Sequence, residues 1–111
     1  MSTPTLNWTD QARLEYLSAV AWYAEHSSND IADRFIDAMA EASHRIVDYP
    51  ALGSDAYSKA LPGAVLRFCK ARDFPYLLFY IEIADESRIE VLRVLHERRD
   101  IPQHLAASSD E

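Results

Sequence analysis

The sequence predicts an α+β fold in which an antiparallel helical hairpin packs on one face of a twisted antiparallel sheet. In the first half of the chain, apolar residues recur every three or four positions, as in helices that are buried on one side. From residue 64 onward the period changes to two, as in half-buried strands. With 111 residues, 49% of them hydrophobic and 26% charged, the chain suits one compact domain over residues 1–111.

The N-terminal segment predicts a short strand that leads directly into a helix. Residues 5–8 alternate β-prone side chains, and Thr9 is a suitable helix N-cap. We expect the helix to run from residue 12 to residues 25–26. Its expected buried face consists of Leu14, Leu17, Ala21 and Ala24, with Tyr16, Val20 and Tyr23 beside them.

A second amphipathic helix is predicted after a turn and N-cap cluster at residues 27–30. Because this link is short, the two helices should form an antiparallel hairpin. Pro50 and Gly53 end the second helix, and residues 50–63 are expected to be irregular. The expected apolar face consists of Ala32, Phe35, Ile36, Met39, Ser43 and Ile46.

The C-terminal half predicts an antiparallel meander of three strands, which begin at residues 64, 76 and 89. Residues 85–87 supply the second turn, residues 102–105 suit a short terminal helix, and residues 106–111 are expected to fray. Each of the first two strands should present two faces. On the first strand, one face carries Leu66 and Phe68 and the other carries Val65, Arg67 and Cys69. On the second strand, one face carries Leu77, Phe79, Ile81 and Ile83 and the other carries Tyr76, Leu78, Tyr80 and Glu82.

Composition excludes several classes of site. Cys69 is the only cysteine, so the chain can form neither an internal disulfide nor a cysteine-based zinc site. His26, His44 and His104 lack ligand spacing and the two glycines form no phosphate-binding loop, so we expect no metal and no cofactor. A net charge of −7 disfavours direct sequence-specific binding of nucleic acid. Because no apolar run is long enough to span a membrane, the expected location is the cytoplasm.

Short motifs are distributed over almost the whole chain. They are Trp8 with Ala12-Arg13, Ala32-x-Arg34-Phe35, Pro50-x-x-Gly53, Arg67, Phe74-Pro75-Tyr76 with Tyr80, and Val91-Leu92-Arg93-Val94-Leu95-His96 followed by Arg98 or Arg99 and Asp100. In this combination, over roughly residues 6–105, the chain resembles the RelE/ParE superfamily of toxins from bacterial type II toxin–antitoxin systems. It is most similar to the ParE-like plasmid-stabilisation toxins.

The resemblance implies a small cytoplasmic toxin that arrests growth when free and is neutralised by a ParD-like antitoxin, whose C-terminal segment wraps around it. ParE-like toxins act on DNA gyrase and stabilise its cleaved complex with DNA. The first hypothesis is therefore a gyrase inhibitor that acts by binding and forms a hetero-oligomer with its antitoxin. Exposed apolar or aromatic groups near the helical hairpin should form the antitoxin groove. The expected target-binding residues are Arg93, His96, Arg98 and Arg99.

Two alternatives remain open. The superfamily also contains RelE toxins, which cut mRNA in the ribosomal A site, and a toxin fold without activity is the third hypothesis. For mRNA cleavage, Arg67 and Arg93 would stabilise the charge on the phosphate and His96 would act as the general acid.

Strand parity bears on this catalytic hypothesis. Arg67 has the opposite parity to its apolar neighbours, so it can leave the core face and point into a groove. Arg93 and His96 have opposite parity on a regular strand and meet only if the strand ends or bulges near residue 95. The structural alternative for Arg93 is an ion pair with Glu82 or Glu90 across the sheet.

Overall fold

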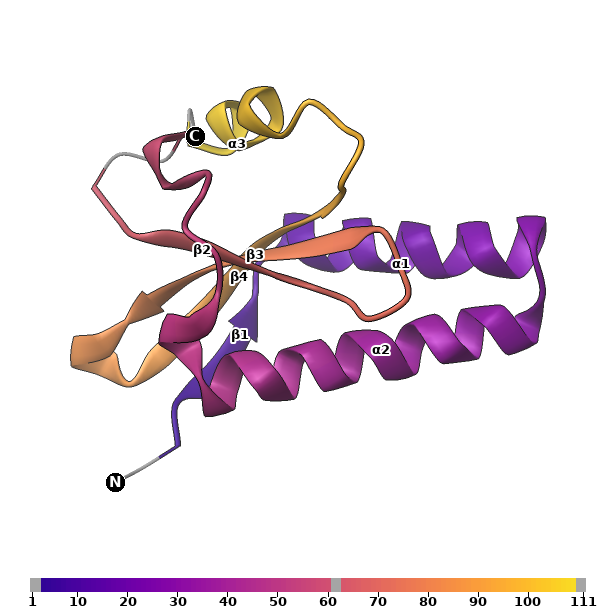
Figure 1. The fold of residues 1–111 in the computed structure, drawn as a ribbon, viewed down its shortest axis with the longest axis horizontal. Helices are drawn as coiled ribbons and strands as arrows, with labels where there is room; N and C mark the ends of the chain where they lie inside the picture. Colours follow the sequence, from indigo (N-terminus) through magenta and orange to yellow (C-terminus); the bar gives the residue numbers. More distant parts are fainter. Residues whose placement is uncertain (1–2, 61–62, 110–111) are drawn as a thin grey trace.

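The computed structural model describes residues 3–60 and 63–109 (Figure 1). The elements are β1 (Thr5–Trp8), α1 (Asp10–His26), α2 (Asn29–Asp48), β2 (Leu66–Lys70), β3 (Tyr76–Ile83), β4 (Arg88–His96) and α3 (Ile101–Ser109). Three short 3-10 turns are described as well, η1 (Pro50–Leu52), η2 (Ser58–Ala60) and η3 (Ala84–Glu86). The predicted α+β class is confirmed, with its N-terminal strand, helical hairpin and C-terminal meander.

Side-chain caps fix the start of each long helix. Thr9 Oγ1 accepts a hydrogen bond from the amide of Ala12 at 3.1 Å, and Ser28 Oγ accepts one from the amide of Ile31 at 3.1 Å. Only a short link separates α1 from α2, so the two helices lie side by side and run antiparallel (Figure 1). The predicted hairpin is confirmed.

The four strands form one sheet in the order β1-β4-β3-β2. β3 pairs antiparallel with both β2 and β4, which is the predicted meander. β1 adds one parallel pair that the sequence does not predict, with Thr5 opposite Arg88 and Trp8 opposite Val91. The pair is parallel because the chain crosses over through α1 and α2 and runs through β2 and β3 before it returns beside β1.

A β-bulge interrupts the pairing of β3 with β4. Phe79 lies opposite Arg93, whereas the next residue, Tyr80, lies opposite Val91, so Leu92 is the extra residue. The bulge precedes both Arg93 and His96, so these two side chains keep opposite parity.

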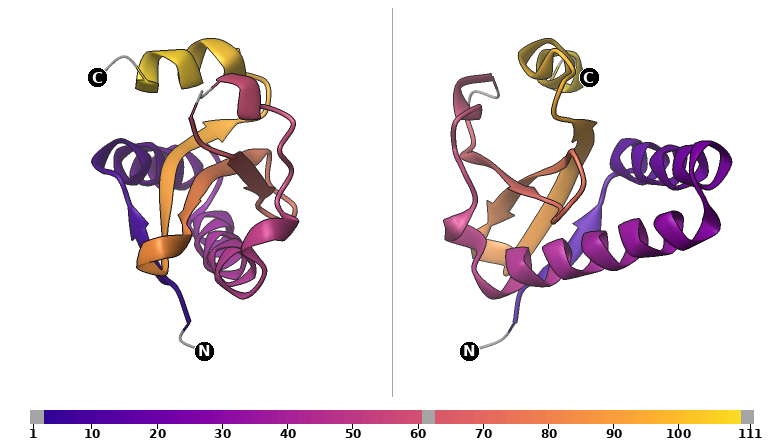
Figure 2. Two further views of the ribbon diagram at one scale, coloured as in Figure 1. Left: turned by 90° about the vertical axis from the view of Figure 1, so that its left-hand side faces the viewer. Right: turned by 45° about the vertical axis from the view of Figure 1, so that its right-hand side comes forward.

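Both faces of the sheet are covered (Figure 2). The helical hairpin covers one face, while α3 and the segment around η2 cover the other. Strand residues that point to either face are therefore buried. On the hairpin face the core contains Phe35, Met39, Ile46, Leu78, Tyr80, Val91 and Val94. On the opposite face it contains Leu66, Leu77, Phe79, Leu95, Ile101 and Leu105.

The prediction for the buried face of α1 is wrong in part. Leu14 and Leu17 are expected in the core, but 61% and 53% of their surfaces are exposed. Apolar residues occur all round this helix, so the spacing fits more than one face, and the aromatic residues that contact Phe35 occupy the core side. Ala21 and Ala24 are also exposed, whereas Ala12 and Ala19 are buried and Tyr16, Val20 and Tyr23 pack around them.

On α2 the predicted face is largely confirmed. Ala32, Phe35, Met39 and Ile46 are buried, as is Ala42, which the prediction omits. Two predicted residues differ: Ile36 is 38% exposed, and Ser43 is half-buried.

The C-terminal helix is longer than the sequence predicts. α3 begins at Ile101, close to Asp100, whose Oδ1 accepts a hydrogen bond from the amide of Gln103 at 3.4 Å. It continues to Ser109, although residues 106–109 are expected to fray. Buried Ile101 and Leu105 anchor the helix to the sheet, and residues 110–111 of the expected tail lie outside the described residues.

The outer edge of β2 is occupied by the preceding segment. Ser54 and Phe68 exchange two backbone hydrogen bonds of 3.0 and 2.9 Å. Ser58 Oγ accepts a hydrogen bond from the amide of Leu66, and Arg45 donates one to the carbonyl of Lys70. Residues 50–63 are expected to be irregular; residues 61–62 of this stretch lie outside the described residues. The described part contains η1 and η2 and covers one edge of the sheet.

Candidate functional site

Arg93, a candidate of both functional hypotheses, is buried and engaged on two sides. Its surface is 7% exposed. Its guanidinium donates to both carboxylate oxygens of Glu15, with distances of 2.6 to 3.1 Å, and Nη1 donates to the carbonyl of His104 at 2.7 Å. The ion pair across the sheet that the sequence suggests, with Glu82 or Glu90, is therefore replaced by a pair with α1.

Glu15 also closes the part of β4 that extends beyond β1. Its Oε1 accepts a hydrogen bond from the amide of Val94 at 2.9 Å, and Thr9 Oγ1 donates to the carbonyl of Leu92 at 2.8 Å. One carboxylate thus joins α1 to the strand and, through Arg93, to α3. Sequence reasoning missed Glu15 because no local pattern connects residues that are 78 positions apart.

His96 sits at the end of β4, where its surroundings fix the ring. It lies opposite Tyr76, with ring centroids 5.3 Å apart at an interplanar angle of 78°. Nδ1 accepts a hydrogen bond from the amide of Arg98 at 3.1 Å, and the His96 carbonyl accepts one from the amide of Arg99 at 3.0 Å. The ring and the backbone together order the turn that follows the strand.

Arg98 and Arg99 are exposed on this turn. Within the described part of the chain, neither guanidinium makes an ion pair or a hydrogen bond. Their neighbour Glu97 forms an exposed ion pair with Lys70 at 3.4 Å. Burial raises the pKa of Tyr76, and the positive charge of Arg99 opposes that rise, so Arg99 acts electrostatically on the ring beside His96.

These residues border a depression between α1 and the end of β4, which we call the α1–β4 groove. It consists of two adjoining hollows of about 500 and 580 Å³. Trp22, which is 51% exposed and stacks on His26 with ring centroids 4.7 Å apart, forms the aromatic wall. Both hollows are lined by Trp22, Tyr76, His96 and Arg99; Leu14, Ser18 and Arg93 add to the first, and Tyr23, Pro75 and Arg98 add to the second.

Arg67 lies apart from the other catalytic candidates. It is opposite Tyr80 on the hairpin side of the sheet, and its Nη1 donates to the carbonyl of Gly53 at 3.0 Å. Arg93 has the parity of the other face. His96 shares the face of Arg67 but lies four residues further along β3, about 13 Å away along the strand direction. The structure therefore does not bring Arg67, Arg93 and His96 into one cluster.

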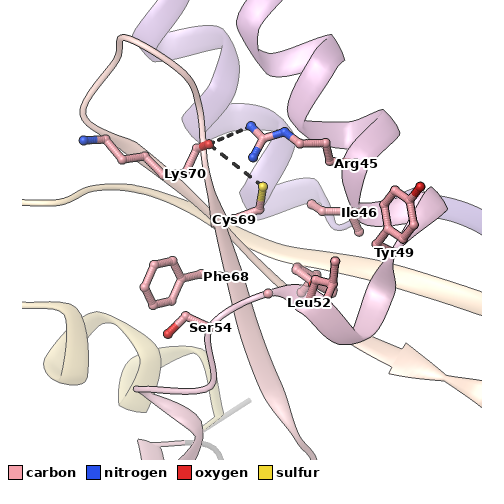
Figure 3. Close-up of a pocket in the computed structure, with 10 residues that line it drawn as sticks. Arg45, Ile46, Tyr49, Leu52, Ser54, Phe68, Cys69 and Lys70 are labelled. Carbon is pink, nitrogen blue, oxygen red and sulfur yellow. Dashed lines mark hydrogen bonds between the residues drawn. The ribbon is translucent and has the colours of Figure 1, made fainter.

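A further pocket of about 310 Å³ lies between the end of α2, η1 and β2 (Figure 3). Cys69 and Arg45 both point toward the carbonyl of Lys70, at 3.9 and 2.9 Å (Figure 3). Burial raises the pKa of the Cys69 thiol, which keeps it protonated and unreactive at neutral pH. This pocket therefore offers apolar surface, including exposed Tyr49 and Leu52, rather than an activated thiol.

Neither a metal cluster nor a membrane span is present in the described ranges. No group of three or more His, Cys, Asp or Glu side chains there could hold a metal ion. No helix described is both long enough and apolar enough to cross a bilayer.

Comparisons with known proteins agree with this architecture. No curated protein sequence matches the chain. A solved structure described as the chromosomal ParDE toxin–antitoxin system from P. aeruginosa is similar, with a TM-score of 0.69 and 17% sequence identity, over 85% of this chain and 96% of that chain. At this identity the likeness shows a shared fold. The family model for the ParE toxin of the type II toxin–antitoxin system parDE matches residues 6–101. The chain therefore belongs to the ParE toxin family of type II toxin–antitoxin systems.

Proposed function

We propose that this protein inhibits DNA gyrase by binding to it and that a cognate, ParD-like antitoxin neutralises it. Membership of the ParE toxin family supports both parts. The observation that carries the binding mechanism is the exposed pair Arg98 and Arg99 beside the aromatic wall of the α1–β4 groove. The guanidinium groups of Arg98 and Arg99 have no partner among the described residues, so they are available for charged groups of a target. The protein would act in the cytoplasm, with gyrase and the antitoxin.

In this proposal the target surface consists of His96, Arg98 and Arg99. Arg93 does not contact the target in this proposal. Its guanidinium binds Glu15 and holds β4 against α1. It is a positioning residue that keeps the turn in place.

Binding without chemistry fits the geometry better than mRNA cleavage. A cleaving site needs positive charge and a proton donor arranged around one phosphate. The candidate residues for these roles, Arg67, Arg93 and His96, do not converge, and both arginines are engaged with acceptors inside the protein.

The test is inhibition of purified gyrase by the purified toxin, followed as loss of supercoiling and gain of cleaved DNA. We expect Arg98→Ala/Arg99→Ala to weaken inhibition at least about tenfold, because it removes two exposed cations of the turn. The matched control is Arg34→Ala/Arg72→Ala, which removes two exposed arginines elsewhere on the surface. It should inhibit like the unaltered toxin.

If the folded Arg98→Ala/Arg99→Ala protein inhibits gyrase as strongly as the unaltered toxin, the site assignment is refuted.

Pulse-labelling of cells just after induction tests the function itself. Early arrest of DNA synthesis supports gyrase as the target, whereas early arrest of translation together with cleaved mRNA would contradict it.

A further inference from the structure

We infer that the α1–β4 groove contacts the DNA that gyrase holds, with Arg98 and Arg99 on backbone phosphates and the base of an unpaired nucleotide against Trp22. The inference rests on the proposed function and deepens it, because it names the chemical group that the exposed arginines bind. That group is a phosphate of the DNA rather than a carboxylate of gyrase. Because phosphates are the same at every step of the strand, the contact does not depend on base sequence.

The first argument is the charge of the groove, which is opposite to that of the chain. The chain carries a net charge of −7, yet among the described residues the two hollows are lined by Arg93, Arg98, Arg99 and only one carboxylate, that of Glu15. Both oxygens of Glu15 accept hydrogen bonds from Arg93, so this pair leaves the positive charge of the other two arginines. Distant acidic groups are screened over about 8 Å at physiological salt, so the groove attracts an anion.

The acidic residues nearest to these arginines in the sequence do not line the groove. Glu97 forms an exposed ion pair with Lys70, and Asp100 accepts a hydrogen bond at the start of α3. Neither guanidinium of Arg98 and Arg99 has a partner among the described residues. Two such cations neutralise about two phosphates, which is a focused contact that an acidic protein can make on DNA already held by another protein.

The second argument is the aromatic surface beside the cations. Trp22 is 51% exposed and lines both hollows together with Tyr76 and His96. Bases stack on such side chains in proteins that bind unpaired strands, whatever the sequence, because every base has a π face. The hollows, of about 500 and 580 Å³, lie within the size range of small-ligand sites. A carboxylate of gyrase would use the cations but leave this aromatic wall without a partner.

The third argument is the tautomer of His96. Its Nδ1 accepts a hydrogen bond from the amide of Arg98 at 3.1 Å, so the neutral ring carries its proton on Nε2. Among the described residues, this Nε2–H has no acceptor, although the ring lines both hollows. A phosphate oxygen supplies the acceptor that this donor lacks.

The turn that carries the cations is ordered without a ligand. The amide of Glu97 donates to the carbonyl of Pro75 at 2.9 Å, and the amide of Arg99 donates to the carbonyl of His96 at 3.0 Å. Because the backbone of the turn is already fixed, binding of phosphate does not have to order it.

The experiment is ultraviolet crosslinking in a complex of the full toxin, gyrase and a duplex that carries iodouracil around the cleavage site. We expect crosslinks between the toxin and the DNA, in toxin peptides that contain Trp22 or residues 96–99. The yield is normalised to the toxin that remains bound to gyrase, so that a loss of affinity is not counted as a loss of contact.

Trp22→Ala should lower the normalised yield at least about tenfold, whereas Trp22→Phe, which keeps a stacking ring, should lower it less than about threefold. Arg98→Ala/Arg99→Ala should lower it at least about fivefold, because the phosphates lose their counter-charges. The controls Tyr49→Ala, at an exposed aromatic residue near the other pocket, and Arg34→Ala/Arg72→Ala should stay within about twofold.

If the unaltered toxin inhibits gyrase but crosslinks only to gyrase, the DNA assignment is overturned while the proposed function stands. Crosslinks to DNA from another toxin surface, with equal yields for the unaltered toxin and Trp22→Ala, would overturn the groove assignment. If the unaltered toxin does not inhibit gyrase, the proposed function fails and the inference fails with it.

Discussion

Glu15 and Arg93 form a buried ion pair that joins the first helix to the last strand. Their side chains are 14% and 9% exposed, and the carboxylate also accepts a hydrogen bond from the amide of Val94. An arginine that the sequence places among the functional candidates is thereby an anchor within the fold. In the proposed function, Arg93 would act through the backbone of β4 and the turn beyond it.

Glu15→Gln should destabilise the protein by about 3–5 kcal/mol, because it leaves the guanidinium of Arg93 buried without its counter-charge. The free energy of unfolding is measured with urea, with Glu25→Gln on the exposed side of α1 as the matched control. In the double variant Glu15→Gln/Arg93→Met the loss should be smaller than the sum of the single losses. A loss under about 1 kcal/mol for Glu15→Gln would show that the pair behaves like a surface ion pair.

Gly53→Ala should destabilise the fold because there is no space for a methyl group. A Cβ atom there would overlap the hydroxyl of Tyr80 and lie 2.9 Å from its Cζ and 3.1 Å from the Cβ of Arg67. Tyr80→Phe should cost about 1–2 kcal/mol, because the phenol donates to the carbonyl of Pro50 at 2.7 Å. Combined, the two changes should cost less than their sum, since removal of the hydroxyl relieves part of the overlap. Strict additivity in urea unfolding would contradict this.

The folded protein should lose stability in alkali. Burial raises the pKa of Tyr16, Tyr23, Tyr76 and Tyr80 above the ordinary value of 10.0, and at Tyr76 the charge of Arg99 opposes this effect. A raised folded pKa gives stability that is complete below the unfolded pKa and is lost as the pH rises through the folded value. Urea unfolding at about pH 8 and about pH 10.5 should therefore show lower stability at the higher pH. Tyrosinate absorbance that titrates identically in folded and urea-unfolded protein would rule this out.

The toxin–antitoxin complex should tolerate salt. Leu14, Leu17 and Trp22 expose apolar surface on the helical hairpin, which a partner can bury, whereas the chain as a whole is acidic and offers few cations for charge pairing. The dissociation constant should change by less than about tenfold between about 0.1 M and about 1 M salt, over which the Debye length falls from about 10 Å to about 3 Å. A steeper weakening, followed by calorimetry with a neutral osmolyte as the control, would indicate binding governed by charge.

Local pattern predicted the fold well where each element has one apolar face. α2 separates apolar from charged residues, and the alternation on β3 matches the two cores, so both elements follow from spacing alone. α1 has apolar residues all round, so only packing decides that Leu14 faces solvent. The parallel pairing of β1 depends on a crossover rather than on local preference.

The candidate site was predictable only in part. The cluster at the end of β4 is visible in the sequence, and the structure places His96, Arg98 and Arg99 together there. The engagement of Arg93 depends on Glu15, and the aromatic wall depends on Trp22, both on a helix far away in the sequence. Tertiary packing brings these residues to the strand, so no spacing rule could have paired them.

The occupied strand edges have a consequence for the lifetime of the free toxin. Ser54, Ser58 and Arg45 cover β2, Thr9 and Glu15 cover the end of β4, and β1 is only four residues long. Proteins with unguarded strands tend to join edge to edge and precipitate. Within the described residues, the chain covers the edge of β2 and the end of β4 by itself, so we expect the protein to stay dispersed when no partner is bound.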